Sequence, residues 1–346
     1  MIASGRGRVV MPDPWVWEGW MIAGLRDAGY DVTLGSAADD HGATPLSPDE
    51  MAALLESADG VILHSRESIL KSALEGASRL IIISKMGIGV DRIDVGAATE
   101  RGIVVTNTPV LDDFRGIAEG TMTLMLALLK QLPQKHQTVR SGRWRDRTTT
   151  GDPLHERTVG LVGLGRVGGM VATLLGPWGV TLLGHDPNVT QIRAAELGVR
   201  LVELDELLTL SDIVSLHAVV TPENRQMFNA RTFGLMKPGS YLINTARGAL
   251  IDEEALVEAL ASGHLAGAAL DVFQTEPLPA GHPLIECENV ILTPHAIGTS
   301  RQSQRAICET ALKNCLDALD GKWPTYPVNP EVASRWRGLR SPAGRD

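Results

Sequence analysis

Residues 158–187 limit the fold of this chain more than any other stretch, because they order an apolar run, a glycine-rich turn and a helix-like run. The β-branched run at 159–162 is typical of a buried strand, and three glycines spaced as G-x-G-x-x-G follow it directly. A second apolar run at 180–183 leads to Asp186, eighteen positions after the last of these glycines. This order is the one that a dinucleotide-binding βαβ unit requires.

Each glycine of the turn has a separate role in such a unit. Gly163 permits the tight turn, Gly165 lets the backbone approach a pyrophosphate, and Gly168 lets the helix pack close to the strand. The phosphates would lie at the helix N-terminus, beside Arg166 and Val167, where N–H groups and the helix dipole favour anions. Glycine-rich turns also occur for purely conformational reasons, so a structural turn is the alternative.

Asp186 indicates which dinucleotide is bound. Its carboxylate is expected to accept hydrogen bonds from the adenosine ribose hydroxyls, and it would repel a 2′-phosphate. No arginine or lysine directly follows it, since the next residues are Pro187 and Asn188. The sequence therefore favours NAD over NADP.

Composition excludes several other classes of protein. The 346 residues carry a net charge of −9 with a pI near 5.5, which argues against nucleic-acid and anionic-membrane partners. No apolar run approaches the roughly 18 residues of a spanning helix. The three cysteines, Cys287, Cys308 and Cys315, lack metal-ligand spacing, so we expect no metal and a cytoplasmic chain with small buried thiols.

Apolar runs alternate with helix-like runs on both sides of the dinucleotide unit, which indicates α/β architecture with parallel sheets covered on both faces. A long apolar run at 116–132 predicts a helix that crosses between two domains, and a last helix at 300–319 returns to the first domain. We therefore expect a substrate domain of residues 1–111 with 300–346 and an NAD-binding domain of residues 112–299.

Several local predictions accompany this architecture. Ser47 and Glu50 form a capping box that predicts a helix start. We expect a helix around 69–74 and an apolar strand at 80–83. The polar and basic stretch 134–151 is expected to be a surface connection.

Polar residues follow several of the predicted strands. His217, Arg247, Asp271 and His295 each lie at or just past the end of a predicted strand. Ligands of doubly wound sheets bind beyond the carboxyl ends of the strands, so position as well as residue type makes these residues functional candidates.

Arg247, Glu276 and His295 together suggest acid–base chemistry on a carboxylic acid. A glutamate beside a histidine stabilises the imidazolium, which can donate a proton to a carbonyl oxygen as hydride arrives from NADH. The arginine could hold a substrate carboxylate bidentately and polarise the carbonyl. Taken one at a time, Arg247 could be a surface ion-pair residue, His295 a structural histidine and Glu276 a loop end.

Longer motifs give the chain a family resemblance from about residue 60 to about residue 330. The motifs are V-G-L-G-R-V-G at 162–168, M-K-P-G followed by L-I-N-T-A-R-G at 236–248, G-A-A-L-D-V-F at 267–273, E-P at 276–277 and T-P-H at 293–295. The chain resembles the D-isomer-specific 2-hydroxyacid dehydrogenases. The resemblance implies a flavodoxin-like substrate domain, a Rossmann NAD-binding domain, an active-site cleft between them and a homodimer formed through the cofactor domain.

The resemblance also implies residue roles. It makes Arg247, Glu276 and His295 the catalytic trio and places Asp271 at the nicotinamide carboxamide. Further cofactor contacts implied in the same way are His217, Ala218, Thr245 and Ala246. Substrate contacts implied on the other domain are Lys85, the backbone amides of Met86, Gly87, Ile88 and Gly89, and Asn107.

The substrate is left open between classes of 2-hydroxy and 2-oxo acid. Lys85 stands where phosphoglycerate dehydrogenases tend to have an arginine, and with His64, Ser65 and Arg66 it could form a phosphate site or be solvated surface charge. The alternative is a glyoxylate or hydroxypyruvate reductase. The family resemblance also extends to transcriptional corepressors that bind NAD(H), which is an alternative of another class.

Two departures from the family pattern stand out. Val219-Val220 replaces an expected proline after Ala218, and the stretch 110–117 is one residue longer than the usual pattern. The second departure bears on the loop geometry on the substrate side.

Overall fold

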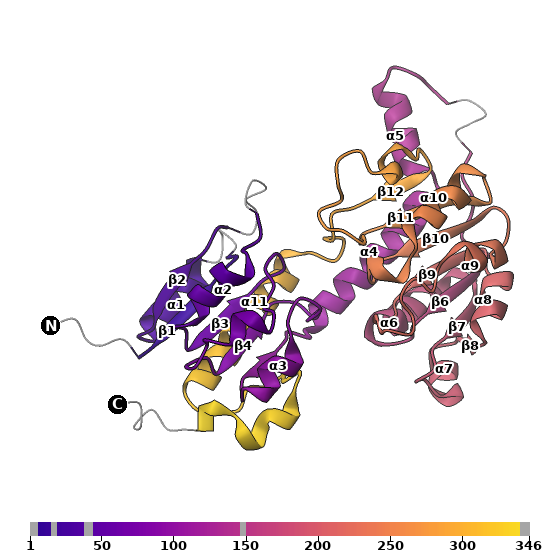
Figure 1. Cartoon of the computed structure of the whole chain (residues 1–346). Helices are drawn as coiled ribbons and strands as arrows, with labels where there is room; N and C mark the ends of the chain where they lie inside the picture. The colour runs from indigo at the N-terminus through magenta and orange to yellow at the C-terminus, as the bar shows by residue number, and fades with distance from the viewer. Residues whose placement is uncertain (1–5, 15–18, 38–43, 146–149, 340–346) are drawn as a thin grey trace. The chain divides into compact units, whose positions relative to one another are not determined.

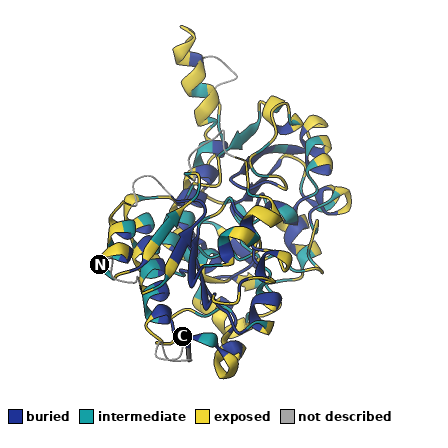
Figure 2. Ribbon diagram, turned by 60° about the vertical axis from the view of Figure 1, so that its left-hand side comes forward, coloured by how far each residue is buried: buried dark blue, intermediate teal, exposed yellow. Residues whose placement is uncertain are grey.

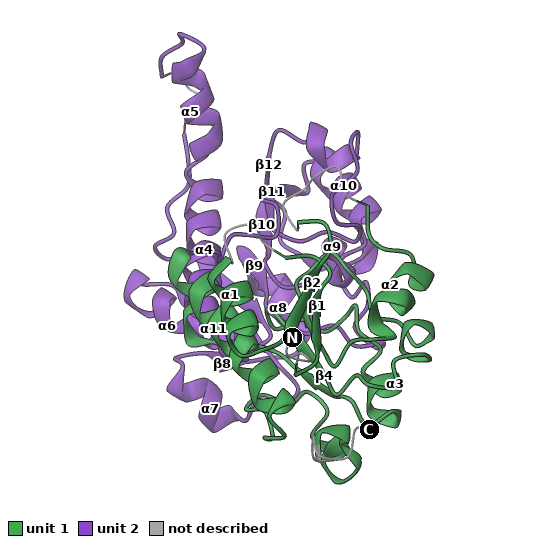
Figure 3. Ribbon diagram, turned by 90° about the vertical axis from the view of Figure 1, so that its left-hand side faces the viewer, with its two compact units in different colours: residues 1–112, 301–346 green, residues 113–300 purple. Residues whose placement is uncertain are grey.

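A computed structural model describes residues 6–14, 19–37, 44–145 and 150–339. The chain divides into two compact units, residues 1–112 with 301–346 and residues 113–300 (Figure 3). In the described ranges no helix is both long and apolar enough to cross a bilayer.

Unit 1 is built on a five-stranded sheet in the order β2-β1-β3-β4-β5, with all neighbours parallel. This is the flavodoxin-like order, which confirms the expected class of fold for this unit. The strands are β1 (Arg8–Met11), β2 (Asp31–Leu34), β3 (Gly60–Leu63), β4 (Ile82–Lys85) and β5 (Val104–Thr106).

Two apolar layers enclose this sheet, because successive residues of a strand point to opposite faces. Val9 packs in one layer with α1 and α11, and its neighbour Val10 packs in the other with α2 and α3. The capping box of Ser47 and Glu50 is present at the start of α2. The helices are α1 (Gly19–Asp27), α2 (Pro48–Leu55), α3 (Val95–Glu100) and α11 (Arg301–Leu319).

Unit 2 is built on a seven-stranded parallel sheet in the order β12-β11-β10-β9-β6-β7-β8 (Figure 1). Counted from its first strand, β6, this is the Rossmann order 3-2-1-4-5-6 with one further strand, as expected. The strands are β6 (Thr158–Val162), β7 (Thr181–His185), β8 (Arg200–Leu201), β9 (Ile213–Leu216), β10 (Ser240–Asn244), β11 (Leu265–Leu270) and β12 (Val290–Leu292).

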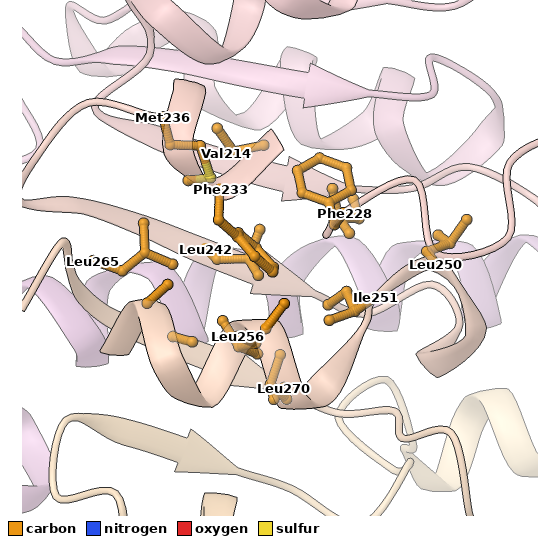
Figure 4. Close-up of a cluster of buried hydrophobic side chains, with 14 of the residues drawn as sticks. Val214, Phe228, Phe233, Met236, Leu242, Leu250, Ile251, Leu256, Leu265 and Leu270 are labelled. Atoms are coloured by element: carbon orange, nitrogen blue, oxygen red, sulfur yellow. The ribbon is translucent and has the colours of Figure 1, made fainter. Parts of the chain in front are cut away.

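Both faces of this sheet are buried. On one face, Leu242 of β10 packs against Phe228, Phe233 and Leu256 (Figure 4). Helices α4 and α6 cover the other face, against residues such as Ile243. The helices are α4 (Leu111–Leu129), α5 (Leu132–Arg140), α6 (Arg166–Leu175), α7 (Gln191–Glu196), α8 (Leu204–Leu210), α9 (Ala230–Leu235) and α10 (Glu253–Ala261).

Helix α5 projects from the rest of unit 2 and is exposed over most of its surface (Figures 1 and 2). The stretch 134–151, expected to be a surface connection, is exposed at most of residues 134–140 but is helical there. Residues 146–149 of that stretch lie outside the described residues.

Candidate active site

The glycine turn joins β6 to α6, and two of its glycines leave no room for a side chain. Gly163 has a φ of 93°, which L side chains rarely adopt, and a Cβ on it would lie 2.7 Å from the carbonyl carbon of His217. A Cβ on Gly168 would lie 2.0 Å from the carbonyl oxygen of Gly163. The tight turn and the close packing of α6 therefore both depend on glycine.

Gly165 lies on the open side of the same turn, where an added Cβ would meet no atom within 4 Å. It is the N-cap of α6, and within the described ranges no side chain caps this helix. The N–H groups of the first turn, which begins with Arg166 and Val167, are left to a ligand, and a helix N-terminus favours an anion. These residues fit a pyrophosphate.

Asp186 follows β7 and directs its carboxylate at the glycine turn. Its Oδ2 accepts a hydrogen bond from the amide of Leu164 at 2.8 Å, and its Oδ1 accepts one from the amide of Asn188 at 2.9 Å. Each carboxylate oxygen keeps further capacity to accept from a hydroxyl group. The acid is therefore fixed beside the turn in the place that suits ribose binding.

His217 and Ala218 follow β9 on the other side of the turn. The amide of His217 donates to the carbonyl of Val162 at 2.7 Å, and its Nε2 lies 3.0 Å from Ser215 Oγ. In the described part of the chain, its Nδ1 is buried without a hydrogen-bond partner. Burial lowers the pKa of His217 to about 4, so the ring is neutral at pH 7.

The buried neutral ring of His217 predicts a loss of stability in mild acid. The unfolded chain takes up a proton on this residue as the pH falls below about 6.5, whereas the folded chain does so only near pH 4. The free energy of unfolding should therefore fall by about 2 kcal/mol between pH 7 and pH 5 through this group. Urea unfolding of His217→Gln should show a pH dependence smaller by that amount. An equal pH dependence in the wild type and in His217→Gln would show that His217 does not cause the loss of stability.

The end of β10 presents Arg247 on a turn that its neighbours fix. Asn244 accepts a hydrogen bond from the amide of Ala246 at 3.0 Å and donates to the carbonyl of Arg247 at 2.9 Å. The guanidinium of Arg247 donates to the carbonyl of Ala246 at 2.7 Å. Gly248 follows in η4 (Gly248–Leu250), and a Cβ on it would lie 1.9 Å from the carbonyl carbon of Phe273.

His295 and Glu276 form the pair that the sequence suggested. His295 Nδ1 lies 2.8 Å from Glu276 Oε2, and the other carboxylate oxygen accepts from the amide of Phe273 at 3.0 Å. This pairing leaves Nε2 of the half-exposed imidazole to meet a substrate. Burial raises the pKa of Glu276, but hydrogen bonds from His295 and Phe273, the charge of His295 and that of Arg247 outweigh it and lower the pKa. Glu276 is therefore an anion beside the imidazole.

Asp271 anchors the loop that carries His295. Its buried carboxylate accepts hydrogen bonds from Thr293 Oγ1 at 2.6 Å and from the amides of Ala296 at 3.0 Å and Ile297 at 3.2 Å. These bonds hold His295 in a left-handed conformation with a φ of 52°, which is uncommon for a residue with a side chain. This anchoring role was not foreseen, and the carboxamide contact stays a prediction.

Helix α4 packs directly against two parts of this site. A Cβ on Gly116 would lie 2.1 Å from the carbonyl oxygen of Gly298, so the helix approaches the His295 loop at backbone distance. Thr121 and Thr245 share a buried hydrogen bond of 2.9 Å between their hydroxyls, next to the Arg247 turn. These contacts were not predicted from the sequence, although the small residues of α4 allow such a close approach.

Unit 1 carries the substrate-side candidates at the end of β4. Lys85 is buried, and its Nζ donates to the carbonyl of Met86. The amide of Met86 donates to the carbonyl of Leu63 at 2.8 Å, and that of Gly87 donates to Thr108 Oγ1 at 2.8 Å. These two amides therefore already have partners within the protein.

The following residues complete this turn. Asn107 donates from Nδ2 to the carbonyl of Ile88 at 3.0 Å, and its own carbonyl accepts from Asn314 at 3.4 Å. A substrate carboxylate bound here would therefore rely on the amides of Ile88 and Gly89 more than on the two before them.

Arg66 does not act as a surface charge, because it is tied into the protein. It pairs with the fully buried Glu67 at 2.8 Å and donates to backbone carbonyls at 36 and 37. The amides of His64 and Arg66 donate to the buried Asp13 at 2.8 and 2.9 Å. Burial, with the charges of Lys85 and Arg66, lowers the pKa of His64 to about 3. His64 is therefore neutral at pH 7.

The glycine turn, the acid after β7 and the Rossmann strand order define unit 2 as a nicotinamide-dinucleotide-binding domain. Residues 122–296 match the family model described as "D-isomer specific 2-hydroxyacid dehydrogenase, NAD binding domain". The chain belongs to the D-isomer specific 2-hydroxyacid dehydrogenase family.

This chain resembles proteins named as phosphoglycerate dehydrogenases and proteins named as glyoxylate reductases. A D-3-phosphoglycerate dehydrogenase of Synechocystis sp. is 38% identical over 90% of this chain, which spans only 57% of that protein. A glyoxylate reductase of Thermofilum pendens is 38% identical over 83% of this chain and 86% of its own length. A crystal structure of a protein from Thermus thermophilus superposes with a TM-score of 0.84 at 36% identity, covering 93% of this chain and 99% of that one.

Proposed function

We propose that this protein is an NAD-dependent oxidoreductase that interconverts a D-2-hydroxy acid and its 2-oxo acid. One observation carries the proposal: the His295–Glu276 pair, 2.8 Å apart, follows β12 and β11 at the strand ends of the same sheet whose β6 ends in the glycine turn. Arg247 follows β10 at these strand ends. An acid–base pair and a cation for a carboxylate are the groups that this reaction needs.

The residues would divide the work as follows. The glycine turn and Asp186 would hold the pyrophosphate and the adenosine ribose of NAD(H), whose nicotinamide would supply or take up the hydride. His295 donates a proton from Nε2 to the substrate carbonyl oxygen in reduction and accepts it from the hydroxyl group in oxidation. Glu276 stabilises the imidazolium form through the 2.8 Å contact to Nδ1. Arg247 binds the substrate carboxylate and polarises the carbonyl.

Two substrate classes are supported by different observations. The phosphoglycerate dehydrogenase relatives and the buried Lys85 support a phosphorylated three-carbon acid. The glyoxylate reductase relative matches this chain over most of both lengths, and Arg66 is engaged by Glu67 rather than left for a phosphate. We therefore propose a small 2-oxo acid, glyoxylate or hydroxypyruvate, as the alternative to a phosphorylated one.

Product analysis tests this proposal. Protein incubated with NADH and hydroxypyruvate or phosphohydroxypyruvate should form the corresponding 2-hydroxy acid, and chiral chromatography should identify it as the D-isomer. An L-isomer, or a racemic product, would contradict the proposed reaction.

We further propose a homodimer formed through unit 2 and a cytoplasmic location. Leu132 and Val139 lie two helical turns apart on one side of α5 and are 58% and 57% exposed, and Trp144 beyond them is 74% exposed. Large apolar side chains on a projecting helix suit burial against a second copy. The three cysteines are thiols and not disulfides, which suits a reducing compartment.

Asp186→Ala should weaken NADH binding and narrow the preference for NADH over NADPH. The carboxylate would lose its bonds to the ribose hydroxyls, and its repulsion of a 2′-phosphate would disappear. Titration of both cofactors by protein fluorescence measures the ratio of their dissociation constants, and we expect that ratio to change about tenfold or more, because one charged hydrogen bond is worth about 1.5–3 kcal/mol. A ratio equal to that of the wild type would show that Asp186 does not determine the preference for NADH over NADPH.

A further inference from the structure

Arg166, in the glycine turn, rests on an aromatic ring from another element. Its guanidinium carbon lies 5.1 Å from the ring centroid of Phe114. Phe114 lies in the first turn of α4 and is 6% exposed, whereas Arg166 is exposed. The ring is therefore held by packing, and the arginine is the exposed partner of the contact.

Arg166 stands at a position of its helix where a positive charge is unfavourable. It is the first residue of α6, where the helix dipole disfavours a positive charge, and the first turn contains no acidic residue. The side chain is long and would lose considerable conformational freedom on binding an anion. A ring that already holds the guanidinium reduces that loss and stabilises the charge.

The contact with the ring also leaves the N–H donors of the guanidinium free to bind an anion. A cation–π contact occupies one face of the planar group, while its N–H groups point outward in the plane. Those N–H groups can meet a phosphate oxygen at the adjacent helix N-terminus, where Gly165 leaves open space. The contact thus presents an arginine that is oriented before an anion arrives.

We propose that Phe114 is a positioning residue for cofactor binding, which holds Arg166 ready to bind the pyrophosphate. The inference rests on the proposed function, since it assumes that the dinucleotide lies in this turn. Phe114 falls within 110–117, the stretch that is one residue longer than the usual family pattern.

A double-mutant cycle read out by NADH binding tests the proposal. Phe114→Leu should raise the dissociation constant of NADH about two- to fivefold, the effect expected of one exposed cation–π contact. Phe114→Tyr, which keeps an aromatic face, should restore it to within twofold. In an Arg166→Ala background, Phe114→Leu should have no further effect, because the residue acts through the arginine.

Phe233→Leu serves as the control, since Phe233 is another buried ring of unit 2, 1% exposed against 6% for Phe114, and lies far in sequence from the turn. It should leave the dissociation constant unchanged, and thermal unfolding should show that each variant is folded. Equal effects of Phe114→Leu with and without Arg166, or no effect at all, would overturn the proposal while the proposed function stands. Absence of saturable NADH binding in the wild type would overturn both.

Discussion

His295→Ala should lower kcat about 10³- to 10⁴-fold and leave the dissociation constant of NADH within about twofold of the wild-type value. In the proposed reaction the imidazole exchanges a proton with the substrate oxygen, and its Nδ1 lies 2.8 Å from the Glu276 carboxylate. The side chain is half exposed, so its removal should cost little folding stability. Steady-state rates of NADH oxidation, together with a fluorescence titration of NADH, separate the two quantities.

His155→Ala is the matched control for this variant. His155 also lies beside a glutamate, with Nε2 at 3.4 Å from Glu156 Oε1, but both side chains are highly exposed. Its removal should leave turnover unchanged. Near-normal turnover of His295→Ala would remove this residue as the acid–base group.

Arg247→Ala should raise KM and lower kcat together, with a loss in kcat/KM of about 10³-fold or more. In the proposed reaction a bound carboxylate would touch this guanidinium in both the ground state and the transition state, so both constants should change. Each charge-assisted hydrogen bond to a carboxylate is worth about 1.5–3 kcal/mol, and a bidentate contact makes two. Full saturation curves for the oxo acid at fixed NADH provide both constants.

The control for the arginine variant is Arg231→Ala. Arg231 pairs with Asp205 at 3.0 Å on the surface of the same unit, where an ion pair contributes little. It should leave kcat/KM unchanged within about twofold. If Arg247→Ala leaves KM unchanged, Arg247 does not bind the substrate carboxylate.

The α/β architecture with parallel sheets was predictable from the alternation of strand-like and helix-like runs, and the family resemblance implied the fold of each unit. In unit 2 the apolar run of β6, the glycine spacing and the acid after β7 all indicate one βαβ unit. The start of α2 was predictable because the side chains of Ser47 and Glu50 each accept a hydrogen bond from the other residue's backbone amide, an interaction local in sequence.

Elements without such signals were predicted poorly. The helix expected at 69–74 is only the 3₁₀ turn η2 (Ser72–Leu74), and the strand expected at 80–83 is Ile82–Lys85. A continuous apolar run has no period that fixes where a strand begins or ends. Helix α5 does not pack an apolar face against the core, and its sequence is mostly polar. The apolar spacing that would predict a helix is therefore absent from this stretch.

The residues of the candidate site could be singled out from the sequence, but most of the contacts between them could not. Arg247 and His295 stood out because they follow strands, and Glu276 because it could pair with a histidine. The structure pairs His295 and Glu276 directly. The hydrogen bonds of Asp271 to the 293–297 loop depend on how a loop folds back over a strand end. Spacing along a sequence does not contain that information.

The measurement that tests the central proposal most directly is the initial rate of NADH oxidation against a panel of 2-oxo acids. The panel should contain glyoxylate, hydroxypyruvate, phosphohydroxypyruvate, phenylpyruvate and 2-oxoglutarate, each repeated with NADPH. We expect turnover of at least one acid, with NADH preferred and activity lost in His295→Ala. Preference for phosphohydroxypyruvate would assign the Lys85 region to phosphate, and preference for a small acid would not. Tight NADH binding without turnover of any acid would contradict the proposed reaction and favour a role in NAD(H) sensing.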